Sequence, residues 1–155
     1  FYIGDNCIIG NNTLIRDYSD LEAGVMIGAY AEVTRCIFQE DVTTHSGFFG
    51  DSIIGRGCRI GAGTITANVR LDRKEVTVMI SNNKIKTNLT SLGCIIGENT
   101  VIGVHCSLMP GTLIGNNCVI GPHSMIIGSV KDNTVTYSRV EYLEKERKGF
   151  DEQMK

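Results

Sequence analysis

Aliphatic side chains recur at every sixth position along most of the chain. The first series runs Ile3, Ile9, Ile15, Leu21, Ile27, Val33, and the second runs Ile96, Ile102, Leu108, Ile114, Ile120, Ile126. Glycine often follows the aliphatic residue, and a small side chain such as Cys7, Thr13 or Ser19 stands four positions after it. A period of six fits neither a helix nor simple alternation, and it is typical of a parallel β-helix built from hexapeptide repeats.

This rhythm predicts how the chain closes on itself. Each hexapeptide would form one short flat face and a corner, so that three faces make a triangular coil of about eighteen residues. Residues eighteen apart then stack at roughly 4.8 Å, the spacing of neighbouring strands. The aliphatic residue would point inward, the small residue would fill the corner, and glycine would ease the turn. We therefore expect one all-β domain over residues 1–136.

Two segments interrupt the repeat. Between Val33 and Ile54 the phase slips, and this interval contains His45. Between Thr66 and Thr90 the repeat gives way to EVTVMI and IKTNL, which read as two strands around a polar turn. We expect an inserted hairpin at about residues 75–92. Because insertions in repeat proteins often carry function, both segments are candidate sites.

The repeat ends near Tyr137, and ten of the last nineteen residues are charged. A 3,4 spacing predicts a short capping or self-associating helix within residues 137–155, kept short by Gly149. The residues with this spacing are Val140, Leu143, Arg147, Phe150 and Met154.

Composition excludes several classes of protein. The 18 glycines show no three-residue period, which excludes collagen, and an apolar fraction of 42% excludes a disordered chain. Lys and Arg number 15 against 17 Asp and Glu, so the net charge of −2 indicates no nucleic-acid or anionic-membrane partner. No apolar run approaches the roughly 18 residues of a spanning helix.

The six cysteines show neither a C-x-x-C pair nor zinc-like spacing with histidine. Five of them occupy repeat positions, which favours small buried side chains over metal ligands or nucleophiles. We therefore expect reduced thiols in a cytoplasmic protein and no metal site.

The segment from His45 to Lys74 reads HSGFFGDSIIGRGCRIGAGTITANVRLDRK. In its histidine, GD pair, IGAGTIT block, Asn68 and Lys74, it resembles the left-handed β-helix acetyltransferase domain of bifunctional enzymes. These enzymes pair a sugar-1-phosphate nucleotidyltransferase with a glucosamine-1-phosphate N-acetyltransferase. The hairpin after Lys74 is similar to archaeal-type members. The resemblance implies a left-handed coil, acetyl-CoA as co-substrate, a homotrimer with sites between neighbouring chains, and an N-terminal nucleotidyltransferase domain outside this sequence.

Through this resemblance, His45 takes the position of the histidine that acts on the sugar amine. The amine must be neutral to attack a thioester, and histidine titrates near neutral pH, so it suits a general base. The alternative is a surface histidine in an irregular loop. His105 and His123 lie eighteen residues apart, which predicts a solvent-facing ladder rather than a metal pair.

The resemblance also implies phosphate-binding residues. Arg16 matches a phosphate-binding arginine, whose fork of donors suits that group. A nearby family lysine falls on Thr34, so that Arg35 beside it would substitute. Alternatively Arg35 forms a surface pair with Asp17, eighteen residues earlier.

The remaining implied contacts concern the sugar and the cofactor. Phe48 replaces a family tyrosine and keeps a ring for the sugar, but loses the hydroxyl. Asn68 and Lys74 match substrate contacts, the alternatives being a turn-stabilising Asn and a solvated Lys. A backbone N–H near Ala62 would stabilise the thioester oxyanion. Two further residues would line the coenzyme A channel: Val104 and Pro122.

These residues predict acetyl transfer from acetyl-CoA to glucosamine-1-phosphate or a close amino-sugar phosphate. Two alternatives stay open. The solenoid would be a non-catalytic domain that trimerises or regulates a nucleotidyltransferase, or it would acylate a different amino sugar, a possibility that Phe48 keeps open.

Overall fold

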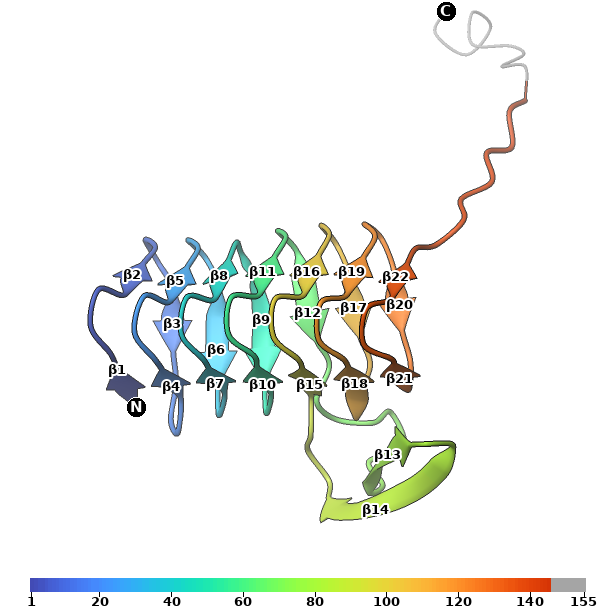
Figure 1. Cartoon of the computed structure of the whole chain (residues 1–155), viewed down its shortest axis with the longest axis horizontal. Coiled ribbons are helices and arrows are strands. Elements are labelled where there is room, and N and C mark those ends of the chain that lie inside the picture. Colours follow the sequence, from blue (N-terminus) through green and yellow to red (C-terminus); the bar gives the residue numbers. More distant parts are fainter. Residues whose placement is uncertain (146–155) are drawn as a thin grey trace, which may run out of the picture.

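The computed structural model describes residues 1–145, which form a solenoid of three parallel sheets and one hairpin (Figure 1). We name the sheets A, B and C in the order in which the chain meets them. Sheet A contains β1 (Tyr2–Ile3), β4 (Asp20–Leu21), β7 (Ile37–Phe38), β10 (Ile53–Ile54), β15 (Cys94–Ile96), β18 (Thr112–Ile114) and β21 (Ser129–Val130). Sheet B contains β2 (Ile8–Ile9), β5 (Met26–Ile27), β8 (Thr43–Thr44), β11 (Arg59–Ile60), β16 (Val101–Ile102), β19 (Val119–Ile120) and β22 (Val135–Thr136). Sheet C contains β3 (Leu14–Ile15), β6 (Glu32–Thr34), β9 (Gly47–Gly50), β12 (Thr64–Thr66), β17 (Ser107–Leu108) and β20 (Met125–Ile126).

The chain visits sheets A, B and C in turn, so each coil adds one strand to every sheet. All pairings within these three sheets are parallel, and the coil advances in the left-handed sense (Figure 1). The turns between sheets stack into three ridges, which we call the AB, BC and CA corners. The predicted left-handed parallel β-helix is confirmed.

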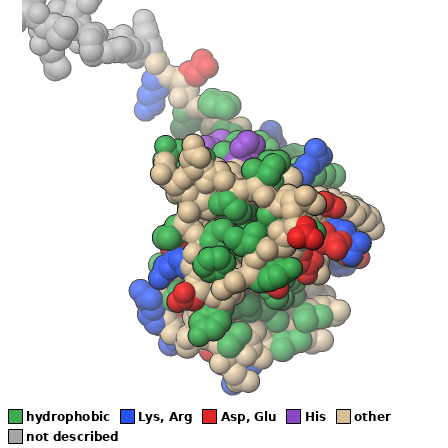
Figure 2. Space-filling model, turned by 90° about the vertical axis from the view of Figure 1, so that its left-hand side faces the viewer, with side chains coloured by type: hydrophobic (Ala, Val, Ile, Leu, Met, Phe, Trp, Pro, Cys, Tyr) green, Lys and Arg blue, Asp and Glu red, His purple; other side chains and the backbone are tan. Residues whose placement is uncertain are grey.

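The core is the column of inward aliphatic residues predicted from the six-residue period. Leu21, Ile27 and Val33 are fully buried, and most later members of the series are also buried. Ile3 and Ile9 point the same way but remain 40% and 36% exposed, because only one neighbouring coil covers them. Viewed onto this end, hydrophobic side chains gather in the middle of the face (Figure 2). Full burial is therefore reached only from the second coil onward.

The cysteines behave as small buried side chains. All six are free thiols, and all except Cys7 are buried. Burial raises the pKa of Cys36 and of Cys58 to about 11, so both thiols stay protonated at neutral pH. The prediction that cysteines fill the solenoid interior is confirmed.

The predicted slip of phase appears as shortened turns at the CA corner. Tyr2 pairs with Asp20, eighteen residues on, whereas Ile37 pairs with Ile53, only sixteen residues on. In the short coils a single residue with positive φ turns the corner, because the strand of sheet C extends further. Between Val33 and Ile54 these residues are Arg35 (φ 51°) and Asp51 (φ 48°).

The predicted hairpin is confirmed. β13 (Val76–Ile80) and β14 (Asn83–Leu89) pair antiparallel, and Ser81 and Asn82 turn between them with φ of 48° and 66°. Two consecutive positive φ values are the mark of a type I′ turn.

The hairpin leaves the solenoid at the CA corner and folds against its later coils (Figure 1). Val76 is fully buried there, and the Ser129 hydroxyl donates to the carbonyl of Met79. An open groove of about 1070 Å³ separates the hairpin from sheet A, with apolar residues such as Leu89 and Ile95 along its walls.

The predicted C-terminal helix is wrong for residues 137–145. Their backbone is irregular, and Val140 and Leu143 are 59% and 91% exposed. A short helix without a packing partner is marginal in water, and these side chains cover no part of the solenoid. The remainder of the predicted helix, including Phe150 and Met154, lies outside the described residues. The described residues contain no helix with the length and hydrophobicity that crossing a membrane requires.

Candidate functional site

His45 directly follows β8 at the BC corner. Its backbone N–H donates to the carbonyl of Ile60 in the next coil, at 3.1 Å. On the other side, a Cβ added to Gly28 would lie 2.7 Å from the His45 Cα, so only glycine permits this close stacking. The imidazole is exposed, and it forms no hydrogen bond with any residue between 1 and 145. The backbone of His45 is therefore fixed, while its ring is free to meet a ligand.

The three residues predicted to contact the cofactor continue the same ridge. Ala62, Val104 and Pro122 occupy the BC corner in the three coils after His45. Gly61 and Gly103 allow this stacking, since their added Cβ atoms would lie 2.7 Å from the Val104 nitrogen and 2.6 Å from the Pro122 nitrogen. The structure thus brings the predicted base and the predicted cofactor contacts into one line.

The N–H of Ala62 finds no acceptor within residues 1–145. The N–H groups on either side of it donate to carbonyls of neighbouring coils. An N–H left without a partner on a rigid ridge is a donor that a ligand oxygen can use.

His105 and His123 also lie on this ridge. Their rings stack with centroids 5.2 Å apart and planes 23° apart. The predicted ladder is confirmed. Within the part of the chain that the structure describes, no group of three or more His, Cys, Asp and Glu side chains could hold a metal ion.

An open groove of about 530 Å³ lies beside His45 on the outer side of sheet B. Its lining includes Met26, Thr43, Arg59 and Val101 from four neighbouring strands. A small ligand in this groove would touch His45 at one edge and the sheet surface beneath it.

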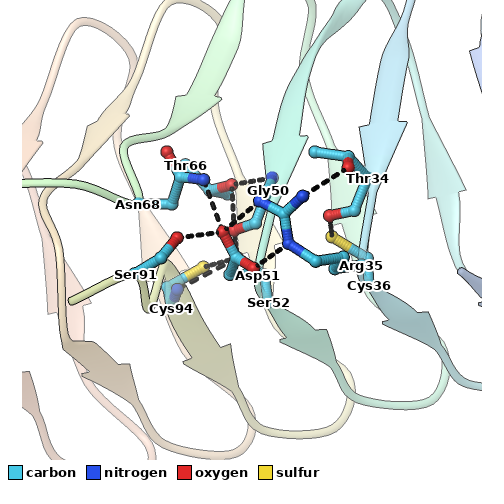
Figure 3. Close-up of polar contacts among 10 residues, drawn as sticks. All are labelled: Thr34, Arg35, Cys36, Gly50, Asp51, Ser52, Thr66, Asn68, Ser91 and Cys94. Atoms are coloured by element: carbon cyan, nitrogen blue, oxygen red, sulfur yellow. Dashed lines mark hydrogen bonds and ion pairs between the residues drawn. The ribbon is translucent and has the colours of Figure 1, made fainter. Parts of the chain in front are cut away.

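A second cluster forms at the CA corner around Asp51 (Figure 3). The Arg35 guanidinium donates two hydrogen bonds to the carboxylate, Nε to Oδ1 at 2.5 Å and Nη2 to Oδ2 at 2.9 Å. Asn68 Nδ2 and the Ser91 hydroxyl donate to the same Oδ2. The alternative pair of Arg35 with Asp17 is wrong, because Asp17 offers only its backbone carbonyl to the Arg35 N–H.

Hydrogen bonds in this cluster determine the charge state of Asp51 and the orientation of the Asn68 side chain. Partial burial raises the pKa of Asp51, but hydrogen bonds from Arg35, Ser91 and Asn68 outweigh it, so the pKa lies below its ordinary value. The ionised carboxylate neutralises Arg35. Asn68 uses one of its two N–H donors on Asp51, so its second N–H and its Oδ1 remain for a ligand.

Three further predicted residues make no hydrogen bond with the Asp51 carboxylate within residues 1–145: Arg16, Phe48 and Lys74. Arg16 is exposed at the CA corner, with Nη1 2.9 Å from the Glu32 carboxylate. Phe48 is half-buried on the outer side of sheet C, where its ring and Asn68 both flank Gly50. Lys74 is exposed in the loop before β13. Among residues 1–145, no hydrogen bond or ion pair joins Arg16 or Lys74 to another predicted site residue.

Sequence reasoning missed Asp51 as the partner of Arg35, and it missed Ser91. The sixteen-residue coil between Arg35 and Asp51 hides their proximity. Ser91 could have been found, since a hairpin insertion must return to the corner that it left at Asn68.

Comparison with known proteins agrees with this architecture. Residues 93–128 match the bacterial transferase hexapeptide family (six repeats), and residues 2–29 match the hexapeptide repeat of succinyl-transferase. The bifunctional protein GlmU of Methanocaldococcus jannaschii is 35% identical over 130 residues, which cover 83% of this chain and 32% of that protein. The chain is a hexapeptide-repeat domain similar to that of GlmU proteins.

A second relative is the bifunctional sugar-1-phosphate nucleotidylyltransferase/acetyltransferase of Sulfurisphaera tokodaii. It is 35% identical over 103 residues, which cover 66% of this chain and 26% of that protein. The domain thus spans about a third or less of the length of these curated relatives. PerB of Caulobacter crescentus, solved with CoA and GDP-perosamine, has a TM-score of 0.62 at 13% identity, covering 84% of this chain and 55% of that one. At that identity it shows the shared fold.

Proposed function

We propose that this chain transfers the acetyl group of acetyl-CoA to the amine of glucosamine-1-phosphate or a close amino-sugar phosphate. One observation carries the proposal: His45 stands exposed on the same ridge as the unpaired N–H of Ala62. In the strand register Ala62 lies one coil on from His45 and one residue along the chain, next to the register partner Gly61. A base and an oxyanion donor at one edge are what acyl transfer to an amine requires.

The reaction follows from these two groups. His45 accepts a proton from the substrate nitrogen, whose lone pair attacks the thioester carbonyl carbon and forms the C–N bond. Negative charge develops on the carbonyl oxygen, where the Ala62 N–H stabilises it. Collapse of this intermediate breaks the C–S bond, and the departing sulfur takes the proton from His45 to give CoA as a thiol.

The cofactor would follow the BC ridge past Val104 and Pro122. The names of the GlmU relatives and of the Sulfurisphaera tokodaii acetyltransferase support this class of reaction. Phe48 and Asn68 would contact the sugar, while Arg16, Arg35 and Lys74 stay predicted contacts.

A neighbouring chain would complete the site in the proposed homotrimer. Asp51 at one corner of sheet C lies six residues after His45 at the other, which is about 20 Å at 3.3 Å per residue. One amino-sugar phosphate cannot span that width. Residues of the CA corner therefore reach a substrate at His45 only if they come from another copy, and a monomer should be inactive.

The test is thiol release from acetyl-CoA that depends on the amino sugar. His45→Ala should lower kcat by about 10²-fold or more, the usual effect of losing a general base. His123→Ala is the matched control, because it removes an exposed histidine from the same ridge and should leave kcat close to wild type. Unchanged release by His45→Ala would remove His45 from the mechanism.

A non-catalytic scaffold is the second candidate. The observation in its favour is that Arg16 and Arg35 both have carboxylate partners, which leaves neither with a free charge for phosphate. Calorimetry with acetyl-CoA separates the two candidates: the enzyme should bind it and the scaffold should not. Comparing amino sugars as acceptors then tests whether Phe48 accommodates a different sugar.

A further inference from the structure

Arg59 is the one charged residue in the outward column of sheet B. The register of the seven strands places these residues in line, and every other member is uncharged. The column runs Ile8, Met26, Thr43, Arg59, Val101, Val119, Val135. No acidic residue therefore stands in line with Arg59 on this face.

The guanidinium of Arg59 has no carboxylate partner within residues 1–145. Arg16 and Arg35 differ in this respect, since Glu32 and Asp51 neutralise them. The two arginines predicted to bind phosphate are therefore paired with carboxylates, whereas Arg59, on another face, is not.

Arg59 and His45 line the same groove. Arg59 lies beside Thr43 in the strand register, two residues before His45, and the carbonyl of the adjacent Ile60 accepts the His45 N–H. A ligand of the size of an amino-sugar phosphate could contact both side chains, with the Thr43 side chain between them.

We propose that Arg59 binds the phosphate of the ligand that occupies the His45 groove. The planar guanidinium matches a phosphate through two parallel hydrogen bonds, and the uncharged walls leave its charge uncompensated until such a group arrives. The phosphate belongs either to the sugar or to coenzyme A. The identity of the ligand rests on the proposed function, whereas the anion site rests on the position of Arg59.

Kinetics distinguishes the two sources. Arg59→Gln should raise KM roughly tenfold or more for the ligand whose phosphate it binds. If that ligand is the sugar, KM rises for glucosamine-1-phosphate and not for glucosamine. If it is the cofactor, KM rises for acetyl-CoA; no rise for the 3′-dephospho form then assigns the contact to the 3′-phosphate, and an equal rise assigns it to the diphosphate. Arg59→Lys should raise KM less than Arg59→Gln does, because lysine keeps the positive charge but cannot form the two parallel hydrogen bonds of a guanidinium.

Arg56→Gln is the control, since Arg56 is an exposed arginine at the AB corner that pairs with Glu40. It should leave all of these KM values unchanged. Equal KM values for Arg59→Gln and wild type with every ligand would overturn the proposal. A change confined to the sedimentation coefficient would assign Arg59 to a contact between copies and would also overturn it.

Calorimetric titration with glucosamine-1-phosphate, coenzyme A and pyrophosphate tests the site without turnover. Binding by wild type that is lost in Arg59→Gln supports the anion site even if no acetyl transfer is found, in which case only the proposed function fails. Binding that is equal in both proteins, or absent from both, overturns the anion site. If acetyl transfer proceeds equally well in wild type and Arg59→Gln, the proposed function stands and the anion site at Arg59 is overturned.

Discussion

At the scale of single residues, one carboxylate joins the solenoid to its insertion. Asp51 accepts hydrogen bonds from Asn68, which precedes the insertion, and from Ser91, which closes it. The same group accepts two hydrogen bonds from Arg35. Loss of the Asp51 charge should therefore loosen the hairpin base and the CA corner together.

Asp51→Asn keeps the size of the side chain but removes this charge. We expect the free energy of unfolding to fall by about 1–2 kcal/mol at pH 7, the range for a partly exposed charged hydrogen-bond cluster. Urea denaturation would measure it. Asp72→Asn is the control, because its pair with Arg70 is exposed and should not affect the unfolding midpoint. An Asp51→Asn midpoint equal to wild type would contradict the bridging role.

The stability difference between wild type and Asp51→Asn should depend on pH. The pKa of Asp51 is lowered in the folded protein, so its stabilisation is present above the unfolded value of about 3.9. It is lost as the pH falls below that value towards the folded pKa. Wild type and Asp51→Asn should therefore become equally stable in acid. A difference that persists undiminished at pH 2 to 3 would point to packing rather than charge.

The candidate site could be predicted only in part from the sequence. The resemblance singled out His45, Ala62, Val104 and Pro122 one by one, and the fold places all four at the BC corner. The partner of Arg35 could not be predicted, because the six-residue rhythm is lost there and the coil length that sets the pairing is a property of the folded backbone.

At the scale of elements, the loss of the six-residue hydrophobic period predicted the hairpin. Alternating residues replaced the hexapeptide rhythm, and two strands with a polar turn were found where they were expected. The surface that the hairpin covers was not predictable, since burial of Val76 depends on coils formed by residues after position 92. The helix predicted from 3,4 spacing does not form in residues 137–145. The spacing would place apolar side chains on one face of a helix, but no surface of the solenoid is there to bury that face.

The hairpin turn gives a prediction at this scale. Ser81 and Asn82 both adopt positive φ, which Asn-Gly adopts more readily. Replacing them by Ser81→Asn with Asn82→Gly should stabilise the hairpin by up to about 1 kcal/mol. Hydrogen exchange of the β13 and β14 amides should slow accordingly.

Ser81→Pro provides the opposite case, because proline fixes φ near −65° and cannot adopt the observed 48°. Exchange of the same amides should accelerate, while that of sheet B should hardly change. If neither variant alters exchange in β13 and β14, the type I′ turn does not control hairpin stability.

At the scale of the whole molecule, stability comes from stacking each coil between two others. In a solenoid the stability is a sum over neighbouring repeats, so a residue in the middle gains from two interfaces and one at the end from a single interface. Ile54 pairs with Phe38 on one side and Ile96 on the other and is fully buried. Ile9 has the same inward orientation but pairs only with Ile27.

This difference predicts unequal effects of the same substitution. Ile54→Ala should lower the free energy of unfolding by about 2–5 kcal/mol, the range for buried cavities. Ile9→Ala should cost about half as much or less, because its side chain is already 36% exposed. Guanidinium denaturation measures both losses. Because chemistry and orientation are matched, equal losses would mean that coverage by neighbouring coils does not set the stability of this β-helix.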